Sequence, residues 1–306
     1  MSADSLAFKA LFGILLPALV AGITWGLAWH IWNRSAEPVA QGAWAGALAV
    51  GLATIAGYLG NEGWPGFPPR TAIGWILFIS CSAIVAGALT HLLPRTLPIR
   101  SVIWLPVVCG SIWVLTATPR ANWKGAEFYG WYAALIGVPW IVAMSTESLA
   151  ERWPGASMPL SLWVWSAGIA GALAATGSLS YGHLAGVLAA AMGAGIVAAW
   201  IKPTISFAHG AAATLIILGI SFLLCGYFYS YLPASSAIIL AAAPLVLWLG
   251  ELSFVTRRRP WMAVALRASF IAVPVMVALL FAAWPMLFPA PSKNAPGGGA
   301  EADFYK

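Results

Sequence analysis

The sequence Ile136-Gly-Val-Pro139-Trp-Ile-Val-Ala-Met144 recurs later in the chain as Ile271-Ala-Val-Pro274-Val-Met-Val-Ala-Leu279. Five of the nine positions are identical, including the proline, and each copy lies in the middle of a long apolar segment. A proline there removes a backbone hydrogen bond that lipid cannot replace, so neighbouring protein must satisfy the freed carbonyl. Two such interruptions at matching places in two halves of a membrane protein predict a transport site.

The composition indicates a membrane protein. Of the 306 residues, 61% are hydrophobic and 8% are charged, whereas about a quarter are charged in soluble proteins. The remaining polar surface is too small to cover a water-soluble globule. The net charge of +6 comes from Lys and Arg scattered through short loops, where they act as topology signals rather than as a nucleic-acid footprint. Three isolated cysteines and the lack of a Cys-x-x-Cys motif support neither a disulfide framework nor a zinc knuckle.

The apolar segments predict an all-α, polytopic helical bundle, since a membrane-spanning helix needs roughly 20 apolar residues. Ten candidate spans occur, at about 8–32, 40–60, 72–93, 99–117, 127–146, 160–179, 183–201, 207–231, 235–250 and 262–288. The first run is longer than the core of a signal peptide and is predicted to be a retained span. The ninth is short and contains Pro244.

Other matches keep the same order in the two halves of the chain. Pro106 in the fourth predicted span corresponds to Pro244 in the ninth. Five spans per half is an odd number, so residues 1–147 and 148–288 are predicted to form an inverted repeat, followed by a disordered tail at 289–306. The alternative is that short matches arise by chance in a chain this rich in small apolar residues.

Two sets of residues are the candidate functional positions. The prolines of the predicted interruptions would leave carbonyls free along a substrate pathway: Pro106, Pro139, Pro244 and Pro274. Two Gly-x-x-x-Gly sequences would let helix backbones approach closely, with the second span packed against the seventh: Gly42, Gly46, Gly182 and Gly186.

Ten spans in about 300 residues, arranged as inverted halves, resemble the layout of the drug/metabolite transporter superfamily. The stretch Ala243-Pro244-Leu-Val-Leu-Trp-Leu-Gly250-Glu251 is similar to the proline-to-Gly-Glu stretch of that family's ninth span, but it has no equivalent in the first half. The resemblance is one of layout and does not identify the family.

The acidic residues lie in loops, at span ends or in the tail. Glu127 and Glu147 bracket the fifth span, and Glu251 closes the ninth. This distribution argues against a carboxylate proton relay or a buried cation site, and it favours a neutral or weakly polar ligand. Arg267, inside the tenth span, is predicted to extend its side chain towards the interface that carries Arg257–Arg259.

Three histidines, His30, His91 and His209, lie at span ends on one predicted face. Imidazoles at one level could bind a metal or haem, but no helical spacing or adjacent carboxylate supports such a site. Interfacial polar residues are therefore the preferred interpretation, and no cofactor, metal or catalytic residue is predicted. An enzyme is the least favoured function because no hydrolase, zinc-protease or nucleotide-binding motif occurs.

These observations favour a small-molecule transporter or permease for a neutral or weakly polar substrate. The alternative is a non-catalytic subunit or scaffold of a larger membrane complex. The expected partners are the lipid bilayer, a small-molecule substrate and other membrane subunits, but not nucleic acid. Loops after odd-numbered spans carry eight Lys and Arg, against six on the opposite side. The positive-inside rule therefore places both termini outside, in a bacterial inner membrane.

Overall fold

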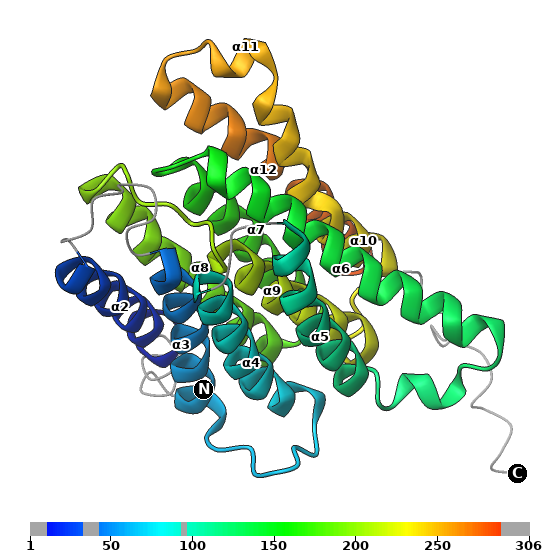
Figure 1. Cartoon of the computed structure of the whole chain (residues 1–306). Helices are drawn as coiled ribbons and strands as arrows, with labels where there is room; N and C mark the ends of the chain where they lie inside the picture. The colour runs from blue at the N-terminus through cyan, green and yellow to red at the C-terminus, as the bar shows by residue number, and fades with distance from the viewer. Residues whose placement is uncertain (1–10, 33–42, 93–96, 289–306) are drawn as a thin grey trace, which may run out of the picture.

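The computed structural model describes residues 11–32, 43–92 and 97–288, and in these ranges it is a bundle of helices without strands (Figure 1). In chain order the elements are η1 (Leu11–Leu15), a π-helical turn, then α2 (Leu16–Trp32), α3 (Ala43–Glu62), α4 (Ala72–Leu92), α5 (Leu97–Leu115), the 3-10 helix η2 (Pro119–Asn122), α6 (Ala126–Arg152), α7 (Ser157–Ala175), α8 (Leu179–Ile201), α9 (Ala211–Tyr229), α10 (Ala234–Ala242), the 3-10 helix η3 (Ala243–Glu251), α11 (Ser253–Thr256) and α12 (Pro260–Leu287). Eight helices of the described ranges are long and apolar enough to cross a membrane. The protein is therefore an all-α integral membrane protein, as its sequence predicts.

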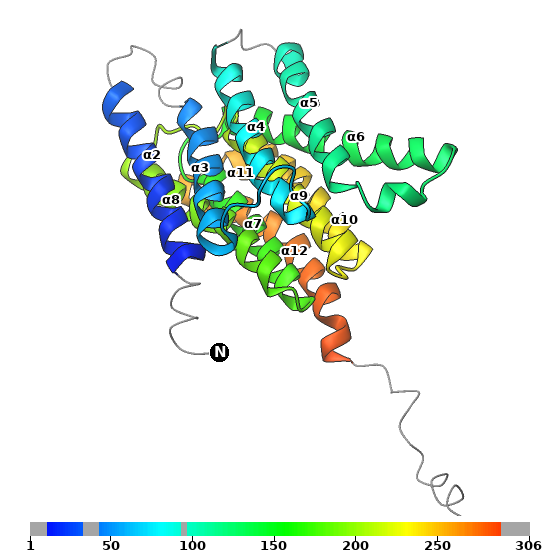
Figure 2. The ribbon, with the colours of Figure 1, turned by 90° about the horizontal axis from the view of Figure 1, so that it is seen from below.

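The predicted spans coincide with helices, but their lengths differ. The fifth, predicted to end at residue 146, continues to Arg152 as α6. Helices α6 and α12 have 27 and 28 residues and are therefore about 40 Å long, more than the ~30 Å thickness of a bilayer core. A bilayer accommodates helices of this length by their tilting or kinking or by thickening locally. Both views show the first turns of α6 extending beyond its neighbours (Figure 1, Figure 2). The predicted tail at 289–306 lies outside the described residues.

Helix α9 occupies the centre of the bundle. Every residue from Ala211 to Gly226 is buried, because α3 to α8 and α10 pack around this helix. At Gly219 a Cβ atom would lie 2.4 Å from the ring of Trp165, so only glycine lets α7 approach this closely. The fully buried Trp165 indole donates a hydrogen bond to the Leu240 carbonyl at 2.7 Å and thereby ties α7 to α10. The centre of the molecule is thus solid packing around one helix.

The ninth span is built from two kinds of helix joined end to end. Residues Ala234–Ala242 are α-helical and Ala243–Glu251 form a 3-10 helix that begins beside Pro244. As a plain α-helix these 18 residues would be about 27 Å long. Because a 3-10 helix rises about 2.0 Å per residue, the combination reaches about 31 Å. The tighter winding therefore lengthens a short segment to the thickness of the hydrocarbon layer.

The Gly-x-x-x-Gly glycines face different neighbours. A Cβ at Gly46 would lie 2.4 Å from the Cβ of Ala211 in α9, and one at Gly182 would lie 3.1 Å from α7. Gly186 has room, with its nearest neighbour at 4.0 Å, and Gly42 lies outside the described residues. The second and seventh predicted spans, α3 and α8, do pack together, but they meet elsewhere. Gly57, where a Cβ would lie 2.5 Å from Val187, makes this contact.

Candidate functional site: a lateral groove at Pro106 and a buried carboxylate at Glu147

The four candidate prolines lie in two pairs of neighbouring helices. Pro106 and Pro139 lie inside α5 and α6, and Pro274 lies inside α12; each of these helices continues through its proline. Pro244 is at the start of η3, which packs against α12. Trp140, next to Pro139, donates a hydrogen bond to the Ser101 carbonyl of α5 at 3.3 Å. A role of the freed carbonyls in a substrate pathway stays a prediction.

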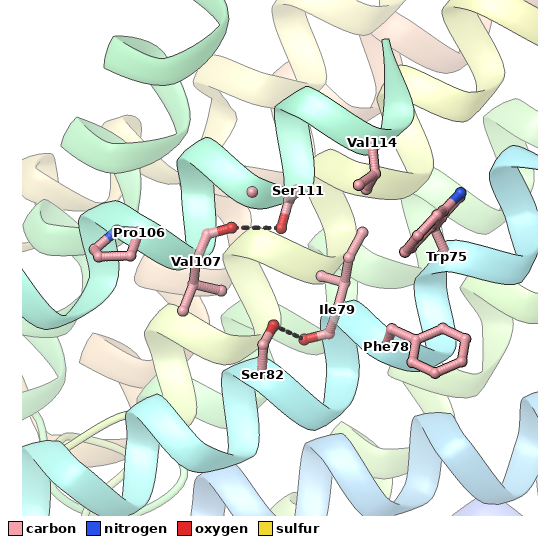
Figure 3. Close-up of a pocket in the computed structure, with 9 residues that line it drawn as sticks. Trp75, Phe78, Ile79, Ser82, Pro106, Val107, Ser111 and Val114 are labelled. Atoms are coloured by element: carbon pink, nitrogen blue, oxygen red, sulfur yellow. Dashed lines mark hydrogen bonds between the residues drawn. The ribbon is translucent and has the colours of Figure 1, made fainter. Parts of the chain in front are cut away.

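A groove of about 320 Å³ lies between α4 and α5 and includes one of these prolines (Figure 3). It is lined by Trp75, Phe78, Ile79, Ser82, Pro106, Val107, Gly110, Ser111 and Val114. Because Ser82, Pro106 and Gly110 are exposed, the groove opens on the outer surface of the bundle. None of its described lining residues is charged.

The two serine hydroxyls of the groove supply hydrogen-bond acceptors. Ser82 donates its hydroxyl proton to the Ile79 carbonyl at 2.8 Å, and Ser111 donates to the Val107 carbonyl at 2.6 Å (Figure 3). Each hydroxyl oxygen therefore keeps lone pairs for a ligand. Pro106 has no N–H, so the carbonyl four residues before it lacks its usual helical donor. The groove can thus hold a small apolar or aromatic molecule that donates hydrogen bonds.

A second site surrounds Glu147 in the last third of α6. This side chain is 2% exposed. Its carboxylate accepts hydrogen bonds from the backbone N–H groups of Gly210 at 2.5 Å and Ala213 at 3.1 Å, at the beginning of α9. The first N–H groups of a helix lack helical partners and carry partial positive charge. Glu147 supplies the acceptors that these N–H groups need, so it anchors α6 to the central helix.

The chain that leads into α9 is buried without being helical. Residues from Ile205 to Gly210 are all buried, and the backbone has positive φ at His209 (61°) and Gly210 (110°). Neighbouring segments satisfy this backbone: the Gly155 N–H donates to the Ile205 carbonyl at 2.8 Å, and the Ser206 hydroxyl accepts the Ala208 N–H at 3.2 Å. Non-helical backbone near membrane depth requires such burial in protein.

Two further charges lie beside Glu147. Arg100 of α5 is buried and forms an ion pair with Glu151, one helical turn beyond Glu147 in α6. Arg100 attracts the Glu147 carboxylate and Glu151 repels it. The sequence places Glu147 directly after the fifth predicted span, whereas α6 continues to Arg152, so Glu147 lies inside the helix. Glu147 and Glu151 are four residues apart and therefore lie on one face of α6. This spacing is the sequence pattern that indicates a cluster of charged side chains.

Charged and aromatic side chains also join α6, η3 and α12 at the same end of the bundle. The Arg267 guanidinium lies 3.9 Å from the centroid of the Trp153 ring. It also donates to the Ser157 hydroxyl at 3.3 Å and to the Gly250 carbonyl at 3.5 Å. Glu251 accepts hydrogen bonds from the Trp153 indole and from Arg152. The Arg267 side chain therefore extends towards the end of the bundle that carries Arg257–Arg259, as the sequence predicts. There it contacts other groups of the protein.

The histidine hypothesis is not tested, because the side chains of His30 and His91 lie outside the described residues. His209 is buried directly before the Gly210 turn. Within the described ranges no group of three or more His, Cys, Asp or Glu side chains is arranged to hold a metal ion. No model of a known protein family and no curated protein sequence matches the chain.

Proposed function

We propose that this protein is a transporter or permease for a small, neutral or weakly polar molecule, and that the molecule binds in the groove between α4 and α5. The groove at Pro106 is the observation that supports this proposal. It combines two aromatic side chains, Trp75 and Phe78, with hydroxyl acceptors on both walls. Its volume of about 320 Å³ is at the small end of ligand pockets, so it suits a compact ligand.

The groove favours a substrate that reaches the protein from within the bilayer. Its lining is apolar and its opening is lateral, so a charged solute would lose its hydration without gaining an ion pair. A ligand with an apolar ring and one hydrogen-bond donor would lose little hydration free energy when it enters the groove. It would gain contacts with the aromatic side chains and with the oxygens of Ser82 and Ser111.

Filling the groove is expected to abolish transport while the fold is retained. Gly110 lines the groove, and an added Cβ there meets nothing within 4 Å. The variant Gly110→Leu should therefore fold as well as the wild type, since leucine is also the better helix former. We expect uptake into proteoliposomes, measured across a panel of small neutral aromatic compounds, to fall at least about tenfold, equivalent to about 1.4 kcal/mol of lost binding.

The matched control is Gly130→Leu in α6, where an added Cβ also meets nothing within 4 Å. This glycine does not line the groove, so its replacement should leave uptake unchanged. Equal uptake by the wild type and Gly110→Leu would contradict the assignment of the ligand to this groove. A loss shared by both glycine variants would assign the effect to helix surfaces in general.

A second candidate function, a non-catalytic subunit or scaffold of a larger membrane complex, is favoured by the packing of α9. This helix fills the centre of the bundle, where a transporter of the predicted inverted-repeat design would have its substrate site. Purification in mild detergent separates the two functions. Stoichiometric recovery of other membrane proteins, together with no uptake by the isolated chain, would support the subunit function.

The proposed orientation has both termini outside a bacterial inner membrane. Helix order places Arg100, Arg152, Lys202 and Arg257–Arg259 at one end of the bundle, which the positive-inside rule assigns to the cytoplasm. Alkaline phosphatase is active only after export, so its fusion to the C-terminus is expected to be active. An active fusion to the loop at Arg257–Arg259 and an inactive C-terminal fusion would reverse the orientation.

A further inference from the structure

A short hairpin between η3 and α12 projects from the bundle at the top of Figure 1. It contains α11 (Ser253–Thr256) and three consecutive exposed arginines, Arg257–Arg259. Large apolar side chains beside them are exposed too: Leu252 by 46%, Phe254 by 51% and Trp261 by 66%. The hairpin therefore presents cationic and apolar side chains on one small surface.

The arginines of the hairpin have no carboxylate partner among the described residues. Among the residues that the structure describes, the carboxylates at this end of the bundle are already engaged. Glu147 binds the backbone of α9, Glu151 pairs with an arginine of α5, and Glu251 pairs with an arginine of α6. Three positive charges thus remain for a ligand outside this part of the chain.

The two kinds of exposed side chain require different surroundings. Placing an arginine in hydrocarbon costs free energy, whereas exposing Trp, Phe and Leu side chains to water is unfavourable. Both requirements are met at the boundary between acyl chains and headgroups, where tryptophan is enriched. The planar guanidinium group also donates two parallel hydrogen bonds to a phosphate, which an ammonium group cannot do.

We propose that the hairpin at 252–261 is a binding site for the headgroup phosphates of anionic lipids. Arg257–Arg259 contact the phosphates, while Phe254 and Trp261 enter the adjoining acyl region. An acidic protein segment would match the arginines, but it would leave the apolar side chains in water. Anionic lipid is therefore the occupant that matches both the charge and the apolar surface.

The test measures lipid retention by the full-length protein in detergent, with added phosphatidylglycerol or phosphatidylcholine and native mass spectrometry as the readout. Each arginine near an anionic surface contributes about a fivefold preference, so three contribute on the order of a hundredfold. We expect the wild type to retain phosphatidylglycerol preferentially, and R257Q/R258Q/R259Q to lose that preference. R257K/R258K/R259K, which keeps the charge but loses the paired donors, should be intermediate.

The matched control is R70Q/K124Q, which removes two exposed charges from the opposite end of the bundle and should leave the preference unchanged. Neutralising topology signals can invert a membrane protein, so the lysine variant and Trp261→Ala are measured in parallel. Trp261→Ala should weaken retention of both lipids. Equal retention of the two lipids by the wild type, or full preference in the glutamine variant, would overturn the proposal. Capture of polyglutamate peptide instead would assign the hairpin to an acidic protein.

Discussion

Replacing Glu147 with alanine is expected to lower the free energy of unfolding by about 2–6 kcal/mol, because two buried backbone donors lose their acceptors. The variant would leave the N–H groups of Gly210 and Ala213 buried without their acceptors, and each such group costs about 1–3 kcal/mol. The measurement is thermal unfolding in detergent, where we expect the midpoint to fall by about 3–9 °C.

Two variants separate the loss of the hydrogen bonds between Glu147 and the start of α9 from the general effect of removing a carboxylate. Glu147→Gln keeps the shape of the side chain and one carbonyl acceptor, so its loss of stability should lie between those of the wild type and Glu147→Ala. Glu127→Ala removes an exposed carboxylate from the first turn of the same helix and should cost less than about 1 kcal/mol. An unchanged midpoint for Glu147→Ala would contradict the anchoring of α9 by α6.

Replacing Gly210 with alanine is expected to destabilise the protein by about 3–5 kcal/mol through two separate causes. The φ angle of 110° is one that side-chain-bearing residues rarely adopt. An added Cβ would also lie 2.8 Å from the Cα of Gly87, and this backbone of α4 cannot rotate away as a side chain can. Thermal unfolding of Gly210→Ala reports the sum of the two costs.

Gly177→Ala is the control that isolates the contact from the backbone strain. Gly177 also has a positive φ, 83°, but an added Cβ there meets nothing within 4 Å. Its replacement should cost only about 1–2 kcal/mol. If the two alanine variants lost the same stability, the close approach of α4 to the start of α9 would not contribute to the destabilisation of Gly210→Ala.

Helix formation was predictable because it depends on local composition. Long apolar runs bounded by Gly, Pro and charged residues are sufficient to locate α4 or α12 within a few residues. The roles of side chains depend on distant partners. The N–H groups that Glu147 caps lie 63 and 66 residues further along the chain. No local pattern shows that pairing, so the residue was interpreted as part of a span boundary.

For the prolines, the local sequence feature is clear, but its effect on the helix is not. The sequence reliably marks where a backbone donor is missing, and Pro106 does line the groove. A missing donor does not determine whether the helix ends there, because α5, α6 and α12 continue through their prolines. The buried non-helical backbone lies at 205–210 instead, before α9. Pro203 and the His209-Gly210 pair are the local signals for that break, and the predicted start of the eighth span at 207 overlooked them.

The burial of α9 on all sides has a consequence for biogenesis. The helices of a nascent chain enter the bilayer in sequence order. Helices α2 to α8 therefore enter before α9, which they surround in the folded protein. Until α9 arrives, the surfaces around Trp165 and Gly46 have no protein partner and must face lipid or each other. The seven helices from α2 to α8 can therefore form only an open intermediate. We expect ribosome-bound chains truncated before residue 211 to be degraded by membrane proteases much faster than chains that extend beyond Tyr229.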